Sequence, residues 1–172
     1  IAAGVKISAI NEALSFGTNI SKGKIVRLMP NLPATVGEGM IALSANENLS
    51  ADEISQIKKM LSKAGKVEQV PETLMDCVTG VSGSGPAYGF LFIEAMADAA
   101  VLCGMPRAQA YTYAAQTLKG AAEMVLETGK HPAELKDAVC SPGGTTIEGV
   151  KALEDNGFRS SIIAAVKNAT DK

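Results

Sequence analysis

The clearest chemical pattern in the chain lies at residues 140–148, which read CSPGGTTIE. Gly143 and Gly144 allow the backbone to approach a ligand closely, and Thr145 and Glu148 have the spacing of a capping box at a helix start. Free N–H groups and the positive end of a helix dipole favour a carboxylate or a phosphate. Local physics leaves two interpretations open: an anion site, or a glycine-containing turn capped only by Thr145.

A second glycine-rich segment, residues 81–89, reads VSGSGPAYG and has some features of a nucleotide-binding loop. The GxGxxG pattern would need glycine at position 88, where the chain has Tyr88, and no convincing strand precedes the segment. We therefore predict a tight entry into a helix, capped by Ser84 or Gly85, with Pro86 in its first turn. The sequence also lacks a Walker motif and a GxSxG motif, so it predicts neither a P-loop nor a nucleophile elbow.

The remaining titratable residues give weaker signals. His131, the only histidine, precedes Pro132 and is expected to cap a helix. Glu94 and Asp98 lie on an otherwise apolar helix and are expected at the rim of a groove, whereas Glu72 is placed favourably for the dipole of a helix over 72–79. No Cys/His cluster has the spacing of a metal site. Three widely spaced cysteines are predicted to be reduced thiols: Cys77, Cys103 and Cys140.

Elements of two kinds alternate over the first 70 residues. Apolar spacing predicts a helix over 5–16, and two strands are predicted at 25–29 and 39–44. Ser50 and Glu53 form a capping box for a helix over 51–64, which Gly65 would end. A short strand is predicted at 66–70.

Only helices are predicted after Pro71, at 86–103, 107–128, 132–139 and 145–155, with one more after Gly157. The helix over 86–103 is apolar nearly all round and therefore needs cover on every side. In a helical segment of about 100 residues a second subunit is a natural source of that cover, so we predict a homodimer through this helix. The alternative is a central core helix in a monomer.

The composition is that of a folded protein: 172 residues, 47% of them hydrophobic, with a formal charge of −2 from 16 basic and 18 acidic residues. No Lys/Arg cluster supports nucleic-acid binding, and no uninterrupted apolar run reaches the roughly 18 residues of a membrane span. The reduced cysteines favour a cytoplasmic protein. The chain starts at Ile1 without an initiator Met or a signal-peptide pattern, and we therefore expect it to be part of a longer protein.

Three segments, taken together and in order, resemble the pyrroline-5-carboxylate reductase family. They are residues 26–34 (VRLMPNLPA), 78–88 (VTGVSGSGPAY) and 131–147, which ends in SPGGTTI. The resemblance covers most of the chain. It implies a two-domain reductase with an N-terminal Rossmann domain for NADPH or NADH and a C-terminal helical domain that dimerises and binds substrate.

The resemblance also implies a domain division and a set of cofactor contacts. Residues 1–70 correspond to the C-terminal part of a dinucleotide-binding Rossmann domain, whose first half with the Gly-rich fingerprint is absent. Residues 71–172 correspond to an all-α domain of the 6-phosphogluconate dehydrogenase C-terminal type. The predicted fold class is therefore an α/β remnant followed by a helical dimerisation domain. Ala2 and Ala3 carry over as nicotinamide contacts, and Asn31 is a weaker candidate.

The family reaction reduces the C=N bond of 1-pyrroline-5-carboxylate to give L-proline. The resemblance places the substrate carboxylate on backbone N–H groups of Gly143, Gly144 and Thr145, with Ser141 in the same loop. Thr146 would be the catalytic residue, hydrogen-bonded to the ring nitrogen and assisting its protonation. Glu72 matches a position near the substrate. At Ala138, where relatives can have Asn near the cofactor, a side-chain hydrogen bond is impossible.

Two functions follow as alternatives. The first is part of a cytoplasmic reductase whose homodimers can assemble into larger rings, and the 172-residue chain alone would show little catalysis because its pyrophosphate site is absent. The second is a non-enzymatic helical dimerisation module that binds small carboxylates or only itself.

Overall fold

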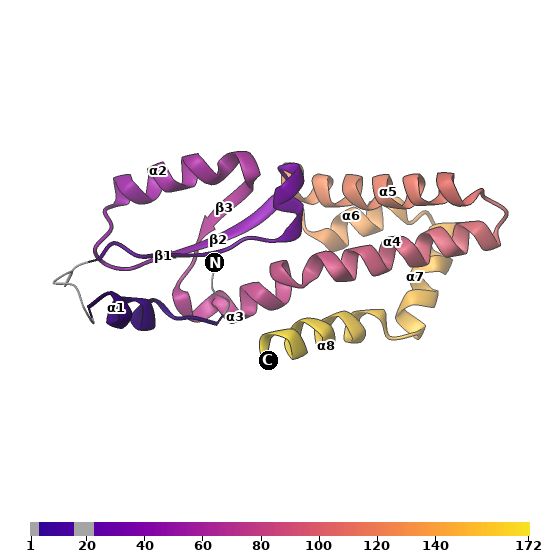
Figure 1. Ribbon diagram of the computed structural model, residues 1–172. Coiled ribbons are helices and arrows are strands. Elements are labelled where there is room, and N and C mark those ends of the chain that lie inside the picture. Colours follow the sequence, from indigo (N-terminus) through magenta and orange to yellow (C-terminus); the bar gives the residue numbers. More distant parts are fainter. Residues whose placement is uncertain (1–3, 16–22) are drawn as a thin grey trace. The chain divides into compact units, whose positions relative to one another are not determined.

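The computed structural model describes residues 4–15 and 23–172 (Figure 1). The chain divides into two compact units. The first, here called the sheet unit, comprises residues 1–86 and 164–172, and the second, the helical unit, comprises 87–163. These packing units differ in their limits from the domains at 1–70 and 71–172 that the sequence predicts, and that division stays a prediction.

The sheet unit contains the three predicted strands, β1 (Val26–Met29), β2 (Gly39–Ala45) and β3 (Gly65–Gln69). They form one sheet in the order β1-β2-β3, with β1 antiparallel and β3 parallel to β2. The central strand holds the core of this unit, because Ile41, Ala42 and Leu43 are at most 2% exposed. The predicted order, in which strands and helices alternate over the first 70 residues and only helices follow, is confirmed.

The parallel pairing of β2 and β3 begins at two glycines in close contact. Gly39 lies opposite Gly65, and Gly65 has φ +142°. A Cβ on Gly65 would lie 1.9 Å from the carbonyl oxygen of Gly39. The helix before it, α2 (Ala51–Leu61), ends in a 3₁₀ turn at Ser62–Ala64, so Gly65 opens the strand rather than ending the helix directly.

The predicted capping box at the start of α2 is confirmed. The Ser50 hydroxyl accepts from the N–H of Glu53, and the Glu53 carboxylate accepts from the N–H of Ser50 at 3.0 Å. The same carboxylate accepts a hydrogen bond from Lys24. This bond from Lys24, followed by the bond from the Ser50 backbone, lowers the pKa of Glu53 from 4.5 to about 2.

We expect the capping box to be sensitive to acid. A carboxylate with a depressed pKa contributes stability that is fully present above pH 4.5 and is lost as the pH falls through about 2. A carboxyl NMR titration of Glu53 should therefore give a midpoint near 2. Lys24→Met should raise that midpoint, whereas Lys58→Met, in the last turn of α2, should not. An unshifted midpoint in the unsubstituted protein would contradict the assignment.

The remaining helices occur where the sequence predicts them. They are α1 (Ile7–Ser15), α3 (Met75–Val78), α4 (Gly85–Leu102), α5 (Arg107–Thr128), α6 (Pro132–Val139), α7 (Thr145–Asp155) and α8 (Phe158–Thr170). Short 3₁₀ turns lie at Leu32–Val36 and Glu72–Leu74.

The expected tight entry into α4 is wrong. The chain instead stays helical through a π-helical turn at Thr79–Gly83, where the N–H of Ser84 donates to the carbonyl of Thr79 at 2.8 Å. Pro86 has no N–H to pair with the carbonyl four residues earlier, that of Ser82. The Asn31 side chain supplies the missing donor at 3.0 Å. Long-range contacts therefore decide the geometry of this glycine-rich segment.

The α4 helix, every residue of which is described, is apolar but poorly covered. Of its residues only Ala97 is buried, while Leu91 and Leu102 are 68% and 89% exposed. Ala97 packs with Ala110 and Ala114 of α5 to form the small core of the helical unit. The apolar surface predicted to need a partner is thus not covered by the helical unit itself.

The helical stretch Glu72–Leu102 is also long and apolar enough, by length and composition, to cross a membrane. The absence of an uninterrupted apolar run of about 18 residues in the sequence therefore does not by itself exclude a span. Core helices of soluble proteins pass the same test, so this single stretch is weak support for a membrane span.

Candidate functional site

The loop between α6 and α7 brings the predicted substrate residues other than Glu72 together at one turn of the helical unit. The α6 helix ends at Val139, and Gly143 has φ +66°, a left-handed conformation that favours glycine. The N–H of Gly144 then donates to the carbonyl of Ser141 at 3.0 Å and closes the turn. The turn leads directly into the first residue of α7, Thr145.

The capping box predicted from Thr145 and Glu148 is wrong. Gly144 is the N-cap residue of α7, no side chain caps the helix start, and Thr145 is already the first helical residue. A Cβ on Gly144 would lie 2.3 Å from the Ser141 hydroxyl, so a larger cap residue would require the Ser141 side chain to move. The first-turn N–H groups of α7 are thus left for another acceptor, and an anion suits them.

The side chains at this helix start are available for a ligand. Thr145 is exposed and Thr146 half-buried. Among the described residues, neither threonine hydroxyl has a hydrogen-bond partner. The Gly144 N–H is already used inside the turn, so among the described residues the donors open to a ligand include the N–H groups of Gly143, Thr145 and Thr146 and the two hydroxyls. This set can bind a carboxylate and donate one further hydrogen bond.

Two other predicted site residues belong to the sheet unit. Asn31 has both polar atoms engaged, since Oδ1 accepts from the N–H of Met40 at 3.0 Å and Nδ2 donates to Ser82. Glu72 Oε1 accepts from Arg27 Nη1 at 3.1 Å and from the N–H of Ile7 at 2.7 Å. Ala2 and Ala3 lie outside the described residues. The roles of all four at a site stay predictions.

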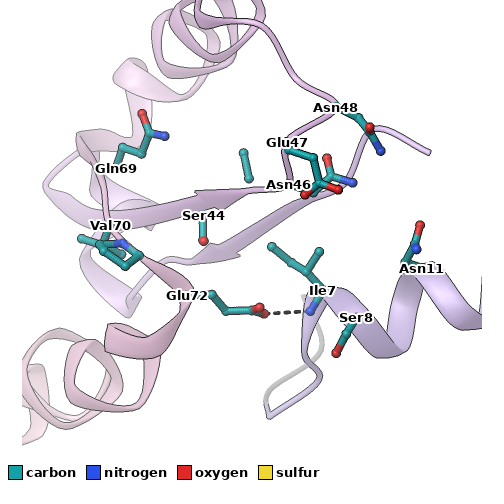
Figure 2. A pocket seen from close by; sticks show the side chains of 12 residues that line it. Ile7, Ser8, Asn11, Ser44, Asn46, Glu47, Asn48, Gln69, Val70 and Glu72 are labelled. Atoms are coloured by element: carbon teal, nitrogen blue, oxygen red, sulfur yellow. Dashed lines mark hydrogen bonds between the residues drawn. The ribbon is translucent and has the colours of Figure 1, made fainter. Parts of the chain in front are cut away.

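Glu72 also borders a polar cavity of about 820 Å³ in the sheet unit (Figure 2). Asn11 of α1, Ser44 of β2 and Asn46 line it as well. Sequence reasoning missed Arg27, whose side chain is only 13% exposed. A charged residue in the middle of the apolar strand VRLM was the available signal, because a half-buried cation needs an anionic partner.

The described residues do not by themselves form a dinucleotide site. No turn from a strand to a helix in 23–172 carries the Gly-rich fingerprint that holds a pyrophosphate, and the two polar atoms of the Asn31 side chain each already make one hydrogen bond within the sheet unit.

The other titratable residues have structural partners or lie in solvent. His131 caps α6, as predicted, with Nδ1 accepting from the N–H of Ala133 at 3.2 Å. Asp98 pairs with Arg107, and Glu94 is exposed. The three cysteines are free thiols. Within the described ranges, no group of three His, Cys, Asp or Glu residues could hold a metal ion.

Known proteins match the chain along its whole length. The family model described as pyrroline-5-carboxylate reductase dimerisation matches residues 72–172. A pyrroline-5-carboxylate reductase from Escherichia coli is 50% identical over 172 residues, which are 100% of this chain and 62% of that protein. One from Synechocystis is 58% identical over 145 residues, 84% of this chain and 54% of that protein. The chain therefore spans about 60% or less of the length of these relatives, and it corresponds to their C-terminal part.

Solved structures agree with these relatives. A pyrroline-5-carboxylate reductase from Coxiella burnetii has a TM-score of 0.91 and 37% identity, covering 99% of this chain and 62% of that one. A Plasmodium falciparum pyrroline carboxylate reductase with NADP bound has a TM-score of 0.86 and 36% identity, covering 98% and 66%. The predicted fold class is confirmed. The chain belongs to the pyrroline-5-carboxylate reductase family.

Proposed function

We propose that this chain is part of an enzyme that reduces 1-pyrroline-5-carboxylate to L-proline with NADPH or NADH. The observation that carries the proposal is the start of α7, where a glycine N-cap leaves the first-turn N–H groups without a side-chain cap. Beside them are two threonine hydroxyls that have no partner in the part of the chain that the structure describes. The substrate is a cyclic imine with a carboxylate, so it needs one anion site and one hydrogen-bonding group at its ring nitrogen.

In the proposed mechanism the carboxylate binds at the positive end of the α7 dipole, on the N–H groups of Thr145 and Thr146. Gly143, Gly144 and Ser141 shape the turn that presents these groups. The Thr146 hydroxyl hydrogen-bonds the ring nitrogen and assists its protonation. The nicotinamide, when bound, supplies the hydride that adds to the C=N carbon. Holding the ring at two points orients that carbon for reaction.

The proposed cofactor contacts in this chain are Ala2, Ala3 and Asn31. Asn31 would act through the position of its loop, at the carboxyl end of β1, since its side-chain amide is already bonded within the sheet unit. Ligands of open α/β sheets bind at such strand ends, which supports the assignment.

We also propose that the enzyme is a homodimer, which can assemble into a larger ring. Leu91 and Leu102 on α4 and Tyr113 on α5 are among the large apolar side chains exposed on the helical unit. Packing this surface against a second copy of the chain would remove apolar area from water, which is energetically favourable. A cytoplasmic protein without membrane or nucleic-acid partners is consistent with the free cysteines and the balanced charge.

The proposed function is tested with the purified full-length protein. Mixed with 1-pyrroline-5-carboxylate and NADPH, it should oxidise NADPH and form proline in equal amounts, and sedimentation should give at least twice the monomer mass. A reaction with NADH in place of NADPH measures the cofactor preference. If NADPH is not consumed in the presence of the imine, the proposed function is wrong.

A further inference from the structure

Glu72 joins three segments that lie far apart in the sequence. Its Oε1 atom accepts from Arg27 Nη1 on β1, 45 residues away, and from the N–H of Ile7 at the start of α1, 65 residues away. Figure 2 shows the carboxylate directed at the first turn of α1. The Arg27 and Glu72 side chains are 13% and 29% exposed, so water competes only weakly for this contact.

The α1 helix has no cap of its own. The residue before it, Lys6, carries an ammonium group that can only donate, and no acidic residue lies in the first turn. The N–H of Ile7 is one of the orphan donors of a helix start. Glu72 therefore acts as an N-cap supplied from a distant part of the chain, and its negative charge lies at the positive end of the helix dipole.

Hydrophobic packing does little to hold α1 in place. None of its residues is buried, and only Ile7, Ile10 and Asn11 are even half-buried. A helix with so little apolar burial depends on its polar contacts for its position. The pair of Glu72 with Arg27 fixes the carboxylate to the sheet, and the bond to Ile7 fixes α1 to the carboxylate.

We propose that Glu72 is a positioning residue for the cofactor side of the reaction rather than a substrate contact. The turn at Gly4, with φ +73°, lies only three residues before Ile7, so the anchor at Ile7 sets where that turn lies. This inference rests on the proposed function, in which the residues beside Gly4 contact the nicotinamide. A carboxylate that is already bonded twice would also repel the carboxylate of the substrate.

The test uses the full-length protein with Glu72→Gln, which removes the charge, and with Glu68→Gln as a control on an exposed carboxylate of β3. Loss of a charge-assisted hydrogen bond should speed amide exchange in residues 7–15 about tenfold. The dissociation constant for NADPH, measured by calorimetry, should rise on the order of fivefold, while KM for 1-pyrroline-5-carboxylate stays the same. Glu68→Gln should change none of these values.

Two outcomes would overturn the inference. One is unchanged exchange in 7–15, and the other is faster exchange without weaker NADPH binding. A raised KM for the imine with unchanged exchange would instead make Glu72 a substrate ligand. If Glu72→Gln does not fold, Arg27→Lys replaces it as the test, because it keeps the positive charge. Amide exchange in 7–15 should then be faster and NADPH binding weaker, both by smaller factors. Exchange and NADPH binding need no turnover, so an inactive wild-type protein would refute the proposed function without deciding this one.

Discussion

Replacing Gly65 with alanine is expected to disrupt the sheet unit and to lower the free energy of unfolding by about 4 kcal/mol or more, among the largest effects of single substitutions. Gly65 has φ +142°, a conformation that side-chain-bearing residues rarely adopt. An added Cβ would lie 1.9 Å from the carbonyl oxygen of Gly39, a backbone atom that cannot move without breaking the pairing of β2 with β3. Denaturant unfolding of the protein measures the loss.

The matched control is Gly149→Ala in the interior of α7. Gly149 has no positive φ, and an added Cβ there would meet nothing within 4 Å. Because alanine restricts the unfolded chain and favours helix, this substitution should raise stability by about 0.5–1 kcal/mol. A loss of less than about 1 kcal/mol for Gly65→Ala would show that the strand pair tolerates a Cβ at this site.

Replacing Thr146 with alanine in the full-length enzyme is expected to lower kcat for imine reduction on the order of a hundredfold. Thr146 is half-buried at the start of α7 and its hydroxyl has no partner among the described residues, so removal of the hydroxyl should not affect folding. The N–H groups that would bind the carboxylate are unchanged, and KM for the imine should change little. Steady-state kinetics at saturating NADPH measure both constants.

Thr146→Ser is the control, because it keeps the hydroxyl and removes only a methyl group. It should retain kcat to within a few-fold of the original enzyme. Equal losses in Thr146→Ala and Thr146→Ser would assign the effect to packing at the helix start, and unchanged kinetics in Thr146→Ala would remove the residue from the proposed mechanism.

Predictions from the sequence succeeded where the signal was local. The capping box of Ser50 and Glu53, the cap at His131 and the three strands are all encoded within a few residues, and all are confirmed. The same kind of reasoning failed at Thr145, where capping-box spacing is present but the preceding turn makes Gly144 the N-cap. Spacing alone cannot show which residue adopts the extended conformation that a cap requires.

In the candidate site, too, the residues with a local signal were predicted and those with distant partners were not. Residues 141–146 are consecutive, so the sequence identified them as one turn, and the structure shows which of their donors are already used. The roles of Asn31 and Glu72 could not be derived from spacing, because their partners lie up to 65 residues away. The role of Arg27 could not be predicted from the sequence, because its half-buried ion pair with Glu72 forms only when β1 packs beside the segment that follows β3.

The sequence by itself determined most of the helices and strands, the glycine-rich turn that precedes α7 and, through three segments, the resemblance to a reductase family. Three contacts were decided only by the tertiary structure. The Asn31 side chain donates a hydrogen bond to the Ser82 carbonyl, which Pro86 cannot pair. Glu72 caps α1 from a distant segment, and Gly39 lies opposite Gly65 in the sheet. The physical reason is that caps and apolar periodicity follow from neighbouring residues, whereas unsatisfied backbone groups find their partners only when distant segments pack.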